Sequence, residues 1–136
     1  MTLLDQLKRD EGLRLEPYRD SEGLLTIGYG HCLDRKGISK SVAEEMLKDD
    51  VNDSEIIRRA MFPWTEQLSE VRRAVFTNLI FNMGGYGLRS FKKFLAAGEH
   101  EQWETAAAEL LDSKYAKQVG ERAQRLATQL IEDRWV

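Results

Sequence analysis

Apolar residues recur at helical spacing along most of the chain, and this pattern predicts a mainly helical protein with one short sheet. Residues 13–33 instead contain short apolar groups broken by Pro17, Gly23, Gly28 and Gly30, which is typical of a small antiparallel sheet with turns. The pattern therefore indicates an α+β fold in which helices predominate. The helices are predicted over 2–11, 39–59, 69–83, 90–97, 101–111, 113–118 and 121–134.

The order of these segments predicts one domain with two lobes and a cleft between them. The small α+β lobe covers about 12–60, and the long helix 39–59 joins it to a larger helical lobe. The larger lobe covers about 61–136 and includes the N-terminal helix 2–11, and we expect the helix over 69–83 to be its buried centre, ended by Gly84, Gly85 and Gly87. The remaining core is expected from Phe91, Phe94, Trp103, Leu110, Leu111, Tyr115, Leu126, Leu130 and Trp135.

Glu11 lies on the apolar side of the predicted N-terminal helix. Thr2 and Asp5 resemble a capping box, and Gly12 stands where helices commonly end. Desolvation and the negative end of the helix dipole both favour a protonated Glu11, which a general acid requires. The alternative is that the helix frays and the side chain enters water. The leucines on the same arc are Leu3, Leu4 and Leu7.

Two further polar residues lie on the predicted hairpin. Asp20 opens the turn 20–23 between strands near 14–19 and 24–28, and Thr26 lies on the returning strand. Each residue alone is explained by local structure, since Asp caps turns and Thr favours strands. Their joint spacing from Glu11 suggests a pair of carboxylates with a hydroxyl, a glycosidase arrangement.

His31 and Asp50 form a candidate structural pair. Asp50 projects into the apolar arc of the helix over 39–59, where a carboxylate needs a charged or hydrogen-bonded partner. His31 ends the glycine-rich strand and can supply that partner. The alternative is that Asp50 lies at a solvated rim and His31 is exposed.

Composition narrows the class of protein. The 136 residues are 42% hydrophobic and 32% charged, which fits a single folded domain. The lone Cys32 cannot form an internal disulfide, and we expect neither a metal nor a cofactor. The N-terminal residues show no signal peptide pattern, and no stretch is long and apolar enough to span a membrane, so we expect no stable membrane insertion.

The net charge of -3 comes from the N-terminal quarter of the chain. Residues 1–34 contain seven acids and four bases, whereas acids and bases balance in 35–65 and again in 66–136. Phosphate binding needs a basic surface, so this acidic segment argues against nucleic acid as a partner.

The run DEGLRLEPYRDSEGLLTIGYGH resembles the active-site region of phage-type lysozymes, the family that includes the T-even phage lysozymes. The resemblance continues through VRRAVFTNLIFNMG, WETAAAEL and ERAQRLATQL, and so covers nearly the whole chain. It implies the two-lobed lysozyme fold. It also implies hydrolysis of the β-1,4 bond between N-acetylmuramic acid and N-acetylglucosamine in peptidoglycan.

The resemblance also implies a role for each matching residue. Glu11 corresponds to the general acid, Asp20 to the second carboxylate and Thr26 to the hydroxyl that helps to position water in an inverting reaction. Arg122 corresponds to a basic residue near the acid, and Asp50 to the partner of His31. Asp10 and Arg125 resemble an ion pair between elements. The expected substrate-binding positions are Cys32, Phe81, Asn82 and Gln118.

Three departures from the T-even relatives affect these expectations. The segment between His31 and Asp50 is about twenty residues shorter, so the outer saccharide subsites are expected to differ. Phe94 and Glu109 replace small or polar residues. The acidic balance also weakens electrostatic attraction to an anionic cell wall.

Two other classes of function compete with a hydrolase. One is a peptidoglycan-binding or phage structural module without catalysis, and the other is a lytic transglycosylase, which cleaves the same bond without water. The presence of Asp20 and Thr26 favours hydrolysis. By family analogy we expect a monomer that accumulates in the host bacterial cytoplasm and reaches periplasmic peptidoglycan once a separate holin opens the inner membrane.

Overall fold

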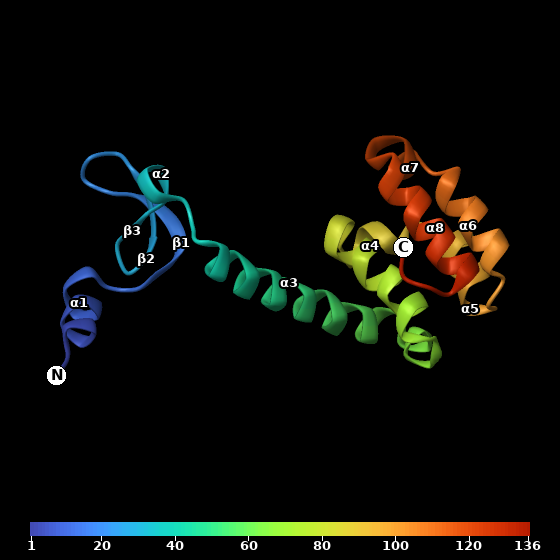
Figure 1. The fold of residues 1–136 in the computed structure, drawn as a ribbon, viewed down its shortest axis with the longest axis horizontal. Helices are drawn as coiled ribbons and strands as arrows, with labels where there is room; N and C mark the ends of the chain where they lie inside the picture. The colour runs from blue at the N-terminus through green and yellow to red at the C-terminus, as the bar shows by residue number, and fades with distance from the viewer. The chain divides into compact units, whose positions relative to one another are not determined.

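The computed structural model describes residues 1–136, which divide into two compact units, Met1–Met46 and Leu47–Val136. The division falls inside a long helix, and the N-terminal helix is in the first unit. The predicted lobes, about 12–60 and about 61–136 with the helix 2–11, stay predictions. The chain is α+β with helices predominating, as the sequence predicted (Figure 1). The cleft predicted between the lobes stays a prediction. None of the helices combines the length and apolar character that crossing a membrane requires.

The first unit begins with α1 (Leu3–Glu11), whose two ends are set by local hydrogen bonds. The Thr2 hydroxyl accepts from the Asp5 backbone N–H at 3.2 Å, and the Asp5 carboxylate accepts from the Thr2 N–H at 2.9 Å. The Thr2 hydroxyl also donates to the Asp5 carboxylate at 2.8 Å, and this bond, together with the one from the Thr2 N–H, lowers the pKa of Asp5. At the other end the Gly12 N–H donates to the Lys8 carbonyl. The predicted capping box and glycine end are therefore confirmed.

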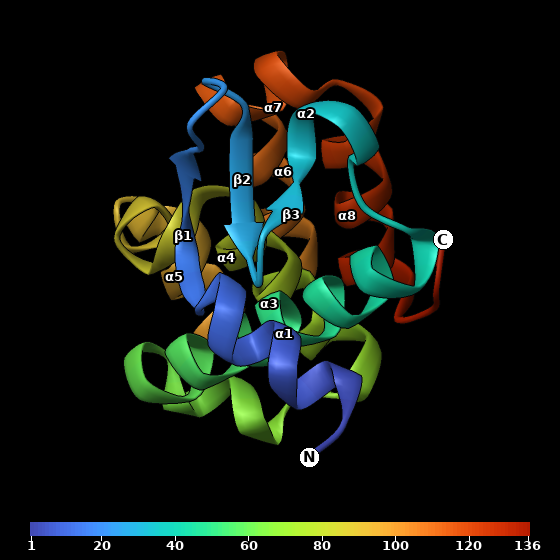
Figure 2. The ribbon, with the colours of Figure 1, turned by 90° about the vertical axis from the view of Figure 1, so that its left-hand side faces the viewer.

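Three antiparallel strands follow, in the order β1-β2-β3, and they lie side by side in Figure 2. They are β1 (Arg14–Arg19), β2 (Leu25–Gly28) and β3 (His31–Cys32). The β1–β2 register is irregular between Arg14 and Tyr18, a stretch that contains Pro17, which has no N–H to donate. The predicted hairpin is confirmed, and β3 adds a third strand. A short helix, α2 (Leu33–Lys36), was not predicted.

A long helix, α3 (Lys40–Met61), carries the chain across the boundary between the units. The Ser39 hydroxyl accepts from the Val42 N–H at 3.2 Å, as expected for a cap at this residue. A short 3₁₀ helix, η1 (Pro63–Gln67), comes next in the second unit.

The second unit is a group of helices, shown together in Figure 1. They are α4 (Glu70–Arg89), α5 (Lys92–Glu99), α6 (Trp103–Leu111), α7 (Lys114–Val119) and α8 (Glu121–Glu132). The central helix was predicted to end at its glycines, which is wrong in part. Gly84 leaves the helical conformation with φ 78°, and the helix then resumes as far as Arg89.

The buried side chains of the second unit confirm most of the predicted core. Phe94, Leu110, Tyr115, Leu126 and Leu130 are buried, as are Val75, Phe76, Leu79 and Ile80 of α4. Aromatic rings connect the helices, with the Phe76 and Phe94 centroids 5.4 Å apart. The assignment of Leu111 and Trp135 to the core is wrong, because they are 43% and 61% exposed. Leu111 ends α6, and Trp135 follows the last helix, where the chain no longer has helical spacing.

Candidate active site

Glu11 is the last residue of α1, and its carboxyl group lies against the backbone of Gly30 in the turn between β2 and β3. The helix contains no buried residue, and Leu3, Leu4 and Leu7 are exposed. Desolvation of Glu11 by these leucines, expected from the helical pattern, therefore does not occur within this unit. The end of the helix does place the Glu11 carboxyl against the turn between β2 and β3.

Asp20 directly follows β1, and one of its two carboxylate oxygens organises the turn. Oδ1 accepts hydrogen bonds from the backbone N–H groups of Glu22 and Leu24, at 2.8 and 2.9 Å. The Asp20 N–H donates to the Leu24 carbonyl at 2.9 Å, and the Gly23 N–H donates to the Asp20 carbonyl. Oδ2 has no hydrogen bond within the unit. The structural role expected of an Asp in a turn and a chemical role are therefore compatible, because they use different oxygens.

Thr26 lies on β2 between the other two strands and is only 3% exposed. It pairs with Tyr18 on β1 and with Cys32 on β3. Its hydroxyl donates to the Leu24 carbonyl at 3.0 Å. Because the hydroxyl proton is used in this bond, the Thr26 oxygen is left to accept, as it would from a bound water.

The first unit thus contains all three predicted catalytic residues and one predicted substrate-binding residue, Cys32, which is next to Thr26 across the strands. The acid comes from a helix end, the second carboxylate from a turn and the hydroxyl from a strand. Gly30 belongs to the same group of residues. The sequence motif contains it, but no role was expected for it, because its contact with Glu11 depends on how α1 meets the sheet.

His31 and Asp50 fall in different units. His31 lies on β3, and its Nε2 is 2.5 Å from the Gly37 carbonyl oxygen. Asp50 is exposed on α3. The pairing of these two residues stays a prediction.

The proposed Asp10 and Arg125 ion pair also joins the two units and stays a prediction. Each residue has a local partner within its own unit. Asp10 is 3.1 Å from the Arg9 guanidinium, and Arg125 is 3.8 Å from the Glu121 carboxylate.

The structure separates the predicted substrate-binding residues of the second unit. Phe81 and Arg122 line one cavity of about 480 Å³, where Arg122 donates to the Asn78 side chain at 2.8 Å. Gln118 lines another cavity, of about 580 Å³, and Asn82 lines neither. Sequence position alone therefore did not show which of these residues share a surface.

The cavity at Gln118 has an aromatic wall and several charged residues. It includes Phe94 and Glu109, the two positions that depart from the T-even relatives. Tyr115 also lines it, and its hydroxyl is buried without a hydrogen-bond partner. Burial raises the pKa of Tyr115, and the charge of Arg122 partly opposes this effect. The Tyr115 hydroxyl thus differs from the Thr26 hydroxyl in the sheet, which donates a hydrogen bond to the Leu24 carbonyl.

The helical α+β chain with its one small antiparallel sheet has a lysozyme-like fold, and the catalytic roles of Glu11, Asp20 and Thr26 stay predictions. The model of the phage lysozyme family matches residues 8–130. The chain therefore belongs to the phage lysozyme family.

Individual relatives agree with the family match. The chain is 29% identical to the probable T4-type lysozyme 2 of Dictyostelium discoideum, over 92% of this chain and 91% of that protein. It is 34% identical to the endolysin of Salmonella phage P22, over 60% of each. It is also 29% identical to the pre-baseplate central spike protein Gp5 of Enterobacteria phage T4, over 93% of this chain and 27% of that protein.

Proposed function

We propose that the protein is an N-acetylmuramidase that hydrolyses the β-1,4 bond between N-acetylmuramic acid and N-acetylglucosamine in peptidoglycan. The observation that supports it most is the arrangement of Asp20, whose Oδ1 is fixed by two backbone N–H groups while Oδ2 stays available. Family membership and the presence of Glu11 and Thr26 in the same unit support the same conclusion.

Each catalytic residue has one task in the proposed reaction. Glu11 protonates the glycosidic oxygen of the leaving sugar as positive charge develops on the ring. Asp20 stays ionised and stabilises that charge or activates water through Oδ2. Thr26 accepts a hydrogen bond from the same water and orients it. Attack from the face opposite the leaving group inverts the anomeric centre.

The glycan strand is proposed to contact further residues of both units. Cys32 lies beside Thr26, whereas Phe81, Asn82 and Gln118 belong to the second unit. Arg122 is proposed as a supporting cation, and His31 and Asp50 as a structural pair. No cofactor or metal is required, since the reaction needs only proton transfer and water.

The biological role is proposed to be lysis of a bacterial host at the end of a phage cycle, by a monomer. The similarity to a phage endolysin supports this role. The enzyme would accumulate in the bacterial cytoplasm and reach periplasmic peptidoglycan through a separate holin. Expression in a bacterium with and without a holin tests this proposal. Lysis that depends on both proteins is expected, and lysis without the holin would contradict the proposed route.

Digestion of purified peptidoglycan tests the chemistry. Mass spectrometry should detect reducing N-acetylmuramic acid ends, and NMR of fresh products should show the inverted anomer. Anhydro-muramic ends would instead identify a transglycosylase. An intact polymer that retains bound protein would identify a binding module.

Glu11→Gln tests the role of the acid. The amide is nearly isosteric but cannot donate the catalytic proton, so activity should fall by at least about a hundredfold. Circular dichroism should show an unchanged fold, because Glu11 is exposed at a helix end. Activity near that of the wild type would remove Glu11 from this role.

A further inference from the structure

Gly30 leaves room for the carboxyl group of Glu11. A Cβ atom at Gly30 would lie 2.6 Å from Glu11 Oε2 and 2.9 Å from Glu11 Cδ. Cβ atoms in proteins essentially never approach other heavy atoms below 3.0 Å. Glu11 therefore cannot keep its position if residue 30 carries a side chain.

A second contact joins the same two segments. Tyr29 and Gly30 form the tight turn between β2 and β3, and Lys8 lies one helical turn before Glu11. The Lys8 Nζ is 5.8 Å from the centre of the Tyr29 ring, within the range of a cation–π interaction. The last turn of α1 thus meets the β2–β3 turn at two points.

We propose that Gly30 is a positioning residue for the general acid. The inference rests on the proposed role of Glu11. The Glu11 side chain is exposed and flexible, so it would rotate away from an added methyl group without disrupting the fold. Its position would nevertheless change by roughly an ångström, and displacement of that size can cost about a hundredfold in rate.

Gly28 provides a matched control. Gly28 and Gly30 have nearly identical φ angles, 72° and 71°, at which L side chains are strained. A Cβ at Gly28 would meet no atom within 4 Å, whereas one at Gly30 meets Glu11. Gly28→Ala therefore reproduces the backbone strain of Gly30→Ala without the contact with the acid.

Steady-state kinetics on soluble, uncross-linked peptidoglycan strands test the proposal. Gly30→Ala should lower kcat at least about tenfold, with KM within about twofold of the wild type. It should also move the alkaline limb of the pH profile of kcat, which reports deprotonation of the acid. Gly28→Ala should keep kcat within about twofold of the wild type. Thermal unfolding establishes that both variants are folded at the assay temperature.

If the alanine variants do not fold, Gly30→Asn and Gly28→Asn replace them, because Asn tolerates positive φ better. Equal losses of kcat at both positions would overturn the proposal, since strain would explain them. A raised KM with unchanged kcat would also overturn it, since it would indicate obstruction of the substrate. Glu11→Gln is assayed in parallel. If it stays active, the proposed function fails, and if it is inactive while Gly30→Ala is fully active, only the role of Gly30 fails.

Discussion

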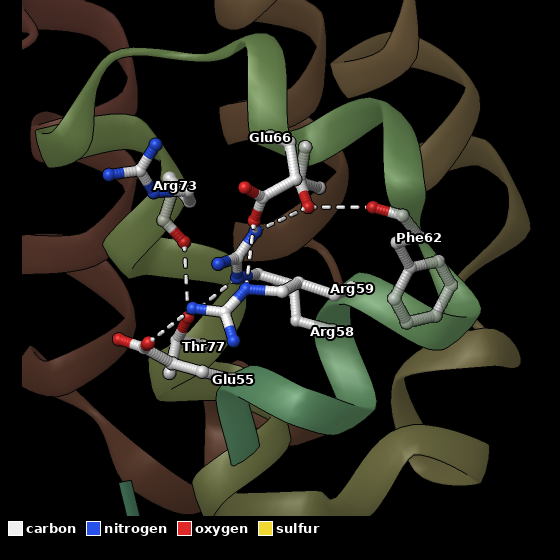
Figure 3. A network of polar contacts seen from close by, with 8 residues as sticks. Glu55, Arg58, Arg59, Phe62, Glu66, Arg73 and Thr77 are labelled. Atoms are coloured by element: carbon white, nitrogen blue, oxygen red, sulfur yellow. Dashed lines mark hydrogen bonds and ion pairs between the residues drawn. The ribbon is translucent and has the colours of Figure 1, made fainter. Parts of the chain in front are cut away.

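The Nε atom of Arg58 donates a hydrogen bond to the Thr77 hydroxyl at 2.9 Å in the interior of the second unit (Figure 3). Only 1% of the Arg58 side chain is exposed. Its Nη1 donates to the Thr65 hydroxyl at 2.9 Å and lies 2.8 Å from the Glu66 carboxylate. One buried cation thereby connects the end of α3 with η1 and α4.

Arg58→Met should lower the free energy of unfolding by about 2 kcal/mol, because it removes hydrogen bonds made by a charged buried group. Arg59→Met is the control. Arg59 is the next residue on the same helix and pairs with Glu55 and Glu66, but half of its side chain is exposed. Exposed ion pairs contribute little, so about 0.5 kcal/mol is expected. Urea unfolding measures both free energies. Equal decreases for the two variants would contradict a larger contribution from the buried Arg58.

The Glu66 carboxylate should make the free energy of unfolding depend on pH in the acidic range. The hydrogen bond from Arg58 lowers the pKa of Glu66 below its ordinary value of 4.5, with smaller effects from Arg59 and Arg73. A carboxyl group whose pKa is lower in the folded than in the unfolded chain stabilises the fold at pH values above its pKa in the unfolded chain. This stabilisation is lost as the pH falls through the pKa of the group in the folded chain. Glu66→Gln should therefore flatten the stability curve below about pH 4.5. The difference should shrink with added salt, because Glu66 is 46% exposed. If the unfolding free energies of the wild type and of Glu66→Gln instead fall in parallel as the pH is lowered, Glu66 does not cause the pH dependence.

Substitutions of Asp20 should separate its structural and chemical roles. Asn keeps an oxygen that can accept from the Glu22 and Leu24 N–H groups, but it lacks the negative charge. Asp20→Asn should keep the wild-type unfolding free energy and lose at least about a hundredfold in kcat. Asp20→Ala should lose the same activity and also about 1 kcal/mol of stability. Urea unfolding and glycan-cleavage assays measure the two effects, and equal stability of both variants would argue against the turn geometry.

Tyr115→Phe should be tolerated at neutral pH, because the hydroxyl that it removes is buried without a partner. The unfolding free energy should change by less than about 1 kcal/mol, or increase. Burial raises the pKa of Tyr115, so ionisation favours the unfolded chain as pH rises above the ordinary value of 10.0. The Phe variant should therefore lose less stability than the wild type above pH 10. A large decrease in the unfolding free energy of Tyr115→Phe at pH 7 would indicate that the Tyr115 hydroxyl does form a hydrogen bond in the folded protein.

Local signals in the sequence were sufficient for most elements. The Thr2 cap was predicted, and Ser39 and Ser69 stand at the predicted starts of their helices. Each of the three hydroxyls accepts from an N–H three residues ahead. The turn at Asp20 was predicted for the same reason, since its partners lie within four residues. Contacts this short depend little on the rest of the chain.

Predictions that needed distant partners were less complete. Trp135 suited a core position by its apolar character but is exposed. No position was predicted for Arg58, which is buried because η1 and α4 provide acceptors that the helical pattern of α3 does not show. The break at Gly84 was located, but the resumption of α4 to Arg89 was missed, because a glycine favours a break without determining the conformation of the residues after it.

The sequence by itself determined the chemical types and order of the candidate residues: a carboxyl at a helix end, a carboxylate in a turn and a hydroxyl on a strand. Their spacing within short elements specifies these places, because caps, turns and strand pairing are local. Only the tertiary structure decided that Gly30 lies against Glu11 and that Phe81 and Gln118 line different cavities. These relationships depend on how separate elements pack, and side-chain volume and shape determine that packing.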